Sequence, residues 1–152
     1  MAAETIGKEN TEVRGAKPSD AARIAALCGQ LGYPTTTRRM SARLRQALKD
    51  RSAACFVAVR REQGVIGWVH VTVRPLLEVE RQAEVSGLVV DERARGQGAG
   101  RLLMEAAERW ARRKRCAEMS LRSNVIREKA HAFYVRRGYK HYKTQKTFRK
   151  RL

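Results

Sequence analysis

The chain has 152 residues, of which 43% are hydrophobic, so it is long enough and apolar enough to bury one substantial core. No apolar run reaches the roughly 18 residues that a membrane span requires, and the polar first twenty residues lack the apolar region of a signal peptide. The formal net charge is +18, and most of the excess lies in residues 93–152, which hold nineteen lysines and arginines against four acidic residues.

This uneven charge predicts an anionic partner for the C-terminal part of the chain, because cationic surfaces attract polyanions. A polyphosphate cofactor, a nucleic acid or both would satisfy that charge. A solvated basic surface without a partner explains the surplus outside the segment 93–101 equally well. The charge alone therefore leaves these alternatives open.

The three cysteines, Cys28, Cys55 and Cys116, are an odd number at wide spacing and form no CxxC pair. They indicate reduced, buried thiols in a cytoplasmic protein rather than a disulfide framework. The three histidines are equally scattered, so we expect no metal site. The lack of an apolar span predicts that the chain has no membrane partner.

The N-terminal third predicts one short strand and two helices. We expect residues 1–10 to be a flexible N-terminus and residues 11–16 to form the strand. Pro18-Ser19-Asp20 is a helix start, and a helical spacing of apolar residues runs from Ile24 to Leu31, after which Gly32 ends the helix. A second helix follows the capping threonines 35–37, with one apolar stripe formed by Met40, Leu44 and Leu48.

The middle of the chain predicts three strands. Residues 53–60 and 65–74 are rich in β-branched residues and are joined by Glu62-Gln63-Gly64, which is typical of an antiparallel hairpin. Pro75 ends the second of these strands, and residues 83–90 form the third. Beyond residue 100, apolar residues at helical spacing predict a helix, followed by a strand over 116–122, a helix over 126–137 ended by Gly138, and a final strand over 139–149.

The stretch VVDERARGQGAG, residues 89–100, places a glycine-rich loop between a predicted strand and a predicted helix. The first N–H groups of a helix lack intrahelical partners and lie at the positive end of the helix dipole. Glycines let the main chain approach an anion closely, and phosphate is the natural ligand of such a helix start. We therefore expect a phosphate-binding loop, with Arg93, Arg95 and Arg101 as cationic donors around it.

Three phosphate-binding motifs compete for this loop. The dinucleotide motif GxGxxG and the P-loop motif GxxxxGK[ST], each started at Gly96, both require a glycine where Arg101 stands. The pattern R-x-x-G-x-G does fit, as Arg95-Gly96-Gln97-Gly98-Ala99-Gly100. This is the acyl-coenzyme-A pyrophosphate motif of the GNAT N-acetyltransferase superfamily, and the chain resembles that family over roughly residues 11–149.

The resemblance implies a mixed α/β (α+β) fold with a mostly antiparallel central sheet and helices on both faces. It also implies that residues 11–152 are a single N-acetyltransferase domain that uses acetyl-CoA. In the family, the strand before the loop splays from its neighbour, and the freed backbone holds the pantetheine arm. Strands 83–90 and 116–122 would splay in this way to hold coenzyme A, and the implied cofactor-binding residues are Leu88, Val89, Val90, Arg95, Gly96, Gln97, Gly98, Ala99, Gly100, Arg101 and Asn124.

Two catalytic residues are carried over from the resemblance. Tyr134 lies in A-x-x-F-Y-x-x-x-G-Y, which is similar to the family's second signature, and would protonate the departing thiolate. Glu84 begins the strand that leads to the loop and would take the proton of the acceptor amine, although a water chain would serve as well. Both residues, and the cofactor-binding candidate Asn124, also have a purely structural interpretation. Tyr134 would then be a core aromatic, Glu84 a solvated residue at a strand end, and Asn124 a turn or cap residue.

The favoured function is direct transfer of the acetyl group of acetyl-CoA to a primary amine of a small molecule or protein. The motif also fits acyl groups other than acetyl. Residues 29–39 are expected to line the acceptor side, but they do not separate an aminoglycoside-like amine, a polyamine, an amino acid and a protein amine. The alternative is a basic nucleic-acid- or ribosome-binding module on the same fold. A nucleic acid is thus compatible with the enzyme but not required by it, and a homodimer is compatible with the family.

Overall fold

The computed structural model describes residues 10–152, so the expectation of a flexible N-terminus falls, apart from Asn10, outside the described residues. The chain divides into two compact units, one ending at Arg122 and one formed by Ser123–Leu152. The first unit contains the sheet and three of the α-helices, and the second contains one helix.

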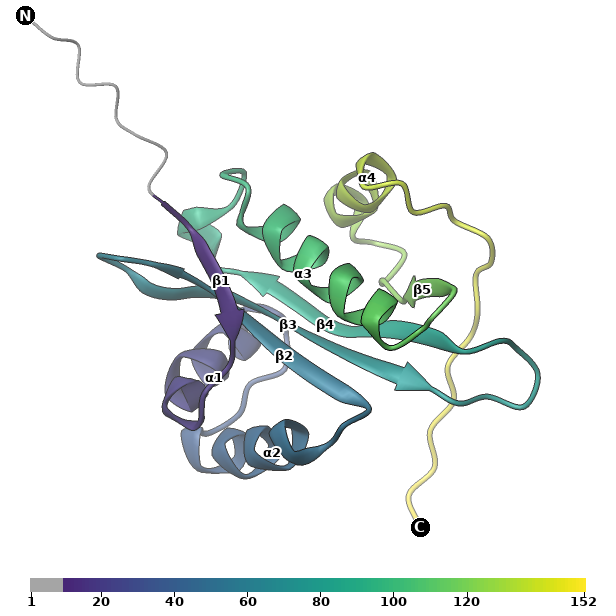
Figure 1. Ribbon diagram of the computed structural model, residues 1–152, viewed down its shortest axis with the longest axis horizontal. Coiled ribbons are helices and arrows are strands. Elements are labelled where there is room, and N and C mark those ends of the chain that lie inside the picture. The colour runs from purple at the N-terminus through teal and green to yellow at the C-terminus, as the bar shows by residue number, and fades with distance from the viewer. Residues whose placement is uncertain (1–9) are drawn as a thin grey trace, which may run out of the picture. The chain divides into compact units, whose positions relative to one another are not determined.

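The first unit is built on a five-stranded sheet in the order β1-β2-β3-β4-β5 (Figure 1). Neighbouring strands are antiparallel, except that β5 runs parallel to β4. The mostly antiparallel sheet that the sequence predicts is therefore confirmed, as are the strands from which it is built: β1 (Glu12–Gly15), β2 (Ala53–Arg60), β3 (Gly64–Arg74), β4 (Gln82–Val90) and β5 (Glu118–Leu121).

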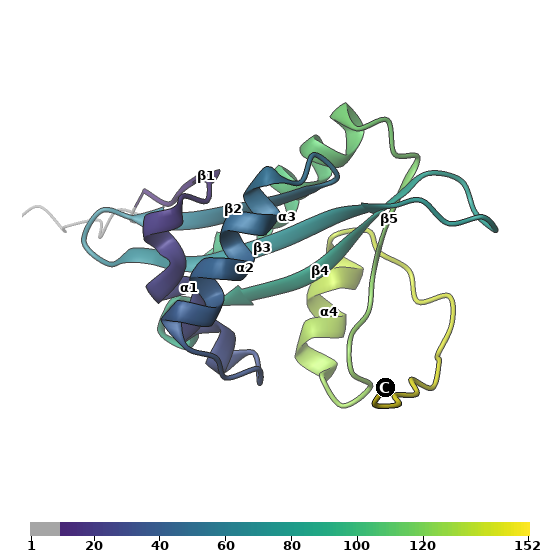
Figure 2. The ribbon, with the colours of Figure 1, turned by 90° about the horizontal axis from the view of Figure 1, so that it is seen from below.

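Helices cover both faces of this sheet. α1 (Ala21–Gln30), which follows the short 3-10 turn η1 (Pro18–Asp20), and α2 (Thr37–Lys49) lie on one face, and α3 (Ala99–Arg113) lies on the other (Figure 2). The predicted threonine cap is present, since Thr36 Oγ1 accepts a hydrogen bond of 3.2 Å from the N–H of Arg39. The expected layers are thus confirmed for this unit.

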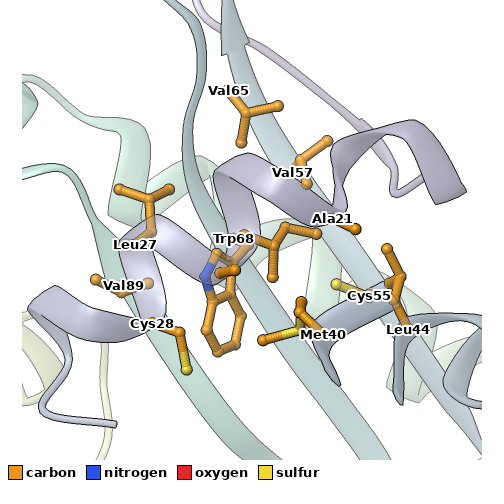
Figure 3. Packing of buried hydrophobic residues seen from close by; sticks show 12 residues of the cluster. Ala21, Leu27, Cys28, Met40, Leu44, Cys55, Val57, Val65, Trp68 and Val89 are labelled. Carbon is orange, nitrogen blue, oxygen red and sulfur yellow. The ribbon is translucent and has the colours of Figure 1, made fainter. Parts of the chain in front are cut away.

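Trp68 of β3 is the largest side chain in the core between the sheet and α1 and α2, where it lies among Leu27, Cys28 and Met40 (Figure 3). Its ring covers Gly87 of the neighbouring strand, where a Cβ atom would stand 2.8 Å from the nearest ring carbon. Glycine is therefore required here by close approach rather than by backbone conformation.

On the opposite face, α3 packs directly over β3 at Gly67. A Cβ atom at this position would stand 2.9 Å from Val89 O and 3.2 Å from Leu103 Cδ1. Because Gly67 has no side chain, Leu103 of α3 packs directly on the backbone of β3, close to the end of β4. This contact positions the glycine loop that joins the two elements.

The strands β4 and β5 part halfway along β4. Their register runs from Gln82 opposite Glu118 to Val85 opposite Leu121, while β4 continues to Val90. At the same point β4 carries a β-bulge, since His70 pairs with Gly87 and Val71 pairs with Val85, which leaves Ser86 as the extra residue. The predicted splay of the two strands is present and begins at this bulge.

The second unit contains α4 (Glu128–Arg136), which confirms the predicted helix, and Gly138 follows it with φ 91°. The predicted strand over 139–149 is wrong, because residues 139–152 contain neither helix nor strand. Residues 140–152 are all exposed, and a strand is stable only when a neighbouring strand accepts its hydrogen bonds. The weak alternation in this segment is one of basic residues with aromatic and polar residues, and none of residues 140–152 is buried.

Candidate functional site

The glycine loop runs from the end of β4 through the 3-10 turn η2 (Glu92–Ala94) into α3. Gly96 has φ 74° and Gly98 has φ 91°, a region that side-chain-bearing residues rarely adopt. Gly98 is the N-cap of α3, and no side chain caps this helix start within the described residues. The first N–H groups of α3 therefore face outward without intrahelical acceptors, as an anion-binding loop requires.

Three polar side chains of the loop are held by neighbours. Arg95 Nε donates to Val90 O at 3.0 Å, and Arg101 Nη1 pairs with Glu105 Oε1 at 2.8 Å. Gln97 Oε1 accepts from Arg60 Nη1 at 2.7 Å. That the arginines surround a phosphate stays a prediction. In this structure Arg95 bonds to the end of β4 and Arg101 bonds along its own helix.

The edge of β4 beyond the bulge presents main-chain groups away from β3. The N–H of Asp91 donates to Ile66 O of β3 at 2.7 Å. Because alternate residues of a strand direct their N–H and C=O groups to opposite edges, those of Val90 and Leu88 point away from β3, toward the side that β5 has left. Val89 is different: it pairs with Trp68, and its side chain lies in the core.

Glu84 lies on β4 before the bulge, opposite Thr72 of β3 and Ser120 of β5. Its carboxylate pairs with Arg74 and with Arg122, whose Nη2 lies 3.0 Å from Glu84 Oε1. Desolvation acts to raise its pKa, but the hydrogen bonds and charges of the two arginines outweigh it, so the pKa of Glu84 is lowered. A carboxylate held in this way is a weak proton acceptor.

Asn124 and Tyr134 both belong to the second unit. Asn124 Oδ1 accepts from the N–H of Ile126 at 3.1 Å and its main-chain oxygen lies 2.9 Å from His131 Nε2, so it orders the turn before α4. Tyr134 lies on α4 with its ring edge-on to those of Phe133 and Tyr139. Burial raises the pKa of Tyr134 against a smaller opposing effect of Arg127, so the phenol is protonated at neutral pH.

The structure adds residues that the sequence patterns did not single out. Arg60, at the end of β2, is only 3% exposed and contacts the loop through Gln97. Gln30 Oε1, at the end of α1, accepts from the N–H of Glu92 at 3.0 Å, and Asp91 pairs with Arg23 at 3.1 Å. One signal was available for Arg60: strand alternation places it on a buried face, where an arginine requires hydrogen-bond acceptors.

A surface pocket of about 280 Å³ lies at the other end of β4, lined by residues 79–81 of the β3–β4 connection, by Gln82 at the start of β4, and by Ala117 and Glu118 before and within β5. It is separate from the glycine loop and from the bulge at Ser86. Within residues 10–152, no cluster of three or more metal-ligating side chains is found, and no helix has the length and apolar character needed to cross a bilayer.

Comparison with known proteins identifies the fold and its chemistry. Residues 21–139 match the model of the acetyltransferase (GNAT) family. The chain belongs to the GNAT acetyltransferase family. It is 30% identical over 131 residues to an aminoglycoside N(6')-acetyltransferase type 1 of Stenotrophomonas maltophilia, with 84% of each chain covered. A second aminoglycoside N(6')-acetyltransferase type 1, from Klebsiella aerogenes, is 30% identical over 105 residues, covering 67% of this chain and 69% of the relative.

Among solved structures, the aminoglycoside acetyltransferase AAC(6')-Iy superimposes with a TM-score of 0.82 at 18% identity, covering 94% of this chain and 99% of that one. It was solved in complex with the bisubstrate analogue CoA-S-monomethyl-acetylneamine. This likeness confirms the fold. Family membership and the two relatives at 30% identity identify this GNAT protein as an acetyl-CoA-dependent N-acetyltransferase.

The residues of the glycine loop fit the diphosphate of acetyl-CoA. A Cβ atom at Gly96 or Gly98 would meet nothing within 4 Å, so the space in front of both glycines is open. The uncapped start of α3 and the freed edge of β4 follow one another along the chain. This GNAT chain thus offers main-chain donors to a diphosphate and a strand edge to an amide-containing arm.

Proposed function

We propose that this enzyme transfers the acetyl group of acetyl-CoA to a primary amine of an aminoglycoside-type amino sugar. The observation that carries the transfer itself is the parting of β4 from β5 after Val85, on the strand that leads through the glycine loop to α3, whose start has no side-chain cap. The acceptor class is supported by two relatives at 30% identity, both named aminoglycoside N(6')-acetyltransferases. The family match runs across Arg122, which supports our proposal that residues 11–152 act as one domain.

In this proposal, acetyl-CoA supplies an activated thioester, and the chain supplies orientation and charge stabilisation. The N–H groups from Gly98 to Arg101 hold the diphosphate, while the main-chain N–H and C=O of Leu88 pair with the pantetheine arm as an added strand would. The N–H of Val90 then lies near the carbonyl oxygen on which negative charge develops. Asn124 uses its Oδ1 in the turn, which leaves its side-chain N–H groups to donate to the arm.

Tyr134 is the proposed acid that protonates the departing sulfur. Burial raises the pKa of its phenol, so the proton that the thiolate needs is present at neutral pH. An ordinary thiol has a pKa of about 8.5 and a phenol a pKa of about 10, so transfer of the proton to the sulfur is slightly uphill. The positioned hydroxyl therefore stabilises the charge that develops on the sulfur by a hydrogen bond and passes its proton as the C–S bond breaks.

The acceptor amine must lose a proton before it attacks, at a cost on the order of 4–5 kcal/mol at pH 7 for an unperturbed alkylamine. Glu84 remains the candidate base from the sequence, but its two arginine partners favour a water chain over direct transfer to this carboxylate. Under this proposal Glu84 chiefly holds Arg74 and Arg122 in place beside the bulge.

The connection between α1 and α2, within residues 29–39, is the proposed acceptor side. Leu31 Cδ2 lies 4.0 Å from the Cβ position of Gly87, so this connection contacts β4 next to the bulge at Ser86. Tyr33, in the same connection, is 68% exposed and offers an aromatic surface to a sugar ring. An acceptor in this position would meet the thioester where β4 and β5 part.

A thiol-release assay tests the proposal. Acetyl-CoA is offered with neamine, spermidine, free amino acids and a lysine-containing peptide, and the release of coenzyme A and the acetylated product are measured. We expect neamine to be the best acceptor, with the acetyl group on its 6'-amine as seen by NMR. Turnover of the peptide or spermidine with none of neamine would contradict the acceptor class but leave acetyl transfer in place.

Nucleic-acid binding is a second candidate function, favoured by the C-terminal segment. Residues 139–152 hold six lysines and arginines and no acidic residue, and the rings of Tyr142 and Phe148 are 73% and 89% exposed. Exposed aromatics among cations suit stacking on single-stranded bases. Oligonucleotide binding that falls steeply with salt and disappears when residues 140–152 are removed would support it, whereas salt-insensitive or absent binding would contradict it.

A further inference from the structure

The buried guanidinium group of Arg60 contacts the glycine loop through the side chain of Gln97. Arg60 is 3% exposed, and its Nη1 donates to Gln97 Oε1 at 2.7 Å. Its Nε donates to Thr11 Oγ1 at 3.0 Å, so the side chain is anchored at a second point ahead of β1. A hydrogen bond from a charged donor is among the stronger contacts that a protein makes, and burial strengthens it.

Strand geometry explains how an arginine reaches this position. Cys55 and Val57 of β2 face the core beneath α1 and α2, so the alternate residues Ala58 and Arg60 face the side that α3 covers. Arg60 is the last residue of β2, and Gln97 immediately precedes the N-cap of α3. The arginine thus lies where the end of one strand meets the loop that leads into the helix.

The bond also fixes the orientation of the Gln97 amide. Arginine only donates hydrogen bonds, so the carbonyl oxygen of the amide must face Arg60, and the NH2 group is turned away from it. Gln97 lies between Gly96 and Gly98, both at positive φ, and glycines restrict the backbone less than residues with a side chain do. A side chain tethered at this residue therefore restrains the peptide units on either side of it.

We propose that Arg60 is a positioning residue that, through Gln97, holds the main-chain N–H groups of the glycine loop in the conformation that binds the diphosphate of coenzyme A. This inference rests on the proposed role of the loop in holding coenzyme A. Without the tether, the loop must be ordered by the ligand itself, and that ordering weakens binding. The transfer of the acetyl group itself is unchanged once acetyl-CoA is bound. Loss of the tether should therefore raise KM for acetyl-CoA and leave kcat nearly unchanged.

The experiment compares Gln97→Ala and Arg60→Lys with the wild-type protein and with Gln46→Ala, a control glutamine on an exposed position of α2. Binding of coenzyme A is measured by calorimetry, and amide hydrogen exchange is followed in residues 95–101. We expect Gln97→Ala to weaken coenzyme A binding about tenfold, equivalent to about 1.4 kcal/mol, and to speed loop exchange. KM for acetyl-CoA rises by a similar factor while kcat stays within about twofold, since the loss is in binding.

Two further variants keep the test independent of folding defects. In Gln97→Glu the carboxylate still accepts from Arg60, so loop exchange stays as slow as in the wild type. The double variant Arg60→Lys with Gln97→Ala should bind coenzyme A no more weakly than the weaker-binding single variant. The reason is that each single change removes the same Arg60–Gln97 hydrogen bond. Should Arg60→Lys fail to fold, Gln97→Ala and Gln97→Glu alone decide the matter.

Wild-type affinity and loop exchange in Gln97→Ala would overturn the inference. If Gly98→Ala nevertheless loses coenzyme A, only the role of Arg60 is wrong and the loop still binds the ligand. If neither variant changes affinity, the assignment of the loop fails together with the inference. Additive losses in the double variant would also overturn it, since they would show that the two side chains act separately.

Discussion

Replacing Gly98 by alanine isolates the contribution of the glycine loop. Gly98 has φ 91°, and a Cβ atom there would meet nothing within 4 Å, so the methyl group has room and the cost is confined to the backbone. A left-handed conformation costs an alanine about 1–2 kcal/mol. For a chain of this size that lowers Tm by about 2–8 °C, which leaves the protein folded.

The effect on ligand binding should be larger than the effect on stability. An alanine relieves its strain by turning the adjoining peptide planes, which redirects the N–H groups of Gly98 and Ala99. Loss of one charge-assisted hydrogen bond costs about 1.5–3 kcal/mol, so the affinity for coenzyme A falls about 10- to 100-fold. At a ligand concentration of about 100 wild-type Kd, the stabilisation drops from about 2.7 kcal/mol to about 0.4–1.4 kcal/mol.

A thermal-shift titration with coenzyme A measures this difference, and Gly32→Ala is the matched control. Gly32 follows α1 with φ 98° and also has nothing within 4 Å of its Cβ position, so it carries the same backbone cost without belonging to the loop. Both variants should melt earlier than the wild type, but only Gly98→Ala should lose most of its ligand-induced shift. Equal shifts in the two variants would refute the assignment of the loop.

Four other predictions follow from particular side chains. Tyr134→Phe should lower kcat about 100-fold while the Kd of coenzyme A stays within about twofold, because general acid catalysis contributes about that much and the hydroxyl is not needed for binding; unchanged kcat would remove the acid role. Glu84→Gln should lower Tm, because Glu84 pairs with Arg74 and Arg122, but it should leave kcat/KM within about fivefold. Loss of a true general base would lower kcat/KM about 100-fold or more, and a loss of that size would identify Glu84 as the base. The pKa of Asp20 is lowered, mainly by its hydrogen bond from Arg14, so Asp20 stabilises the fold fully above its unfolded pKa and loses this effect as pH falls through its lower folded pKa. Asp20→Asn should therefore flatten the decline of Tm in acid, and an unchanged slope would contradict this. Burial raises the pKa of Cys55 to about 12, so iodoacetamide at pH 8 should modify Cys116 well before Cys55, and mass spectrometry showing equal rates would show that Cys55 is not protected.

Local sequence determined most of the secondary structure. Residues 53–60 and 65–74 are rich in β-branched residues and are separated by a turn, and the structure has β2 at Ala53–Arg60 and β3 at Gly64–Arg74. The loop was equally readable, because R-x-x-G-x-G between a strand and an amphipathic helix needs positive φ at its glycines, and Gly96 and Gly98 both have it. These features depend on a residue and its near neighbours in the chain, so they are present in the sequence itself.

What only the tertiary structure decided depends on residues distant in the chain. Alternation in residues 139–149 predicted a strand, but pairing is supplied by a neighbouring strand, and none pairs with that segment in the described residues. The charge on Glu84 was evident, yet its weakness as a base follows from Arg74 on β3 and Arg122 after β5. Likewise Arg60 and Gln97 are 37 residues apart in the sequence, and they form a hydrogen bond because the sheet places the end of β2 next to the glycine loop. Side-chain partners and proton affinities are set by the packed fold, since they depend on distances that no local pattern encodes.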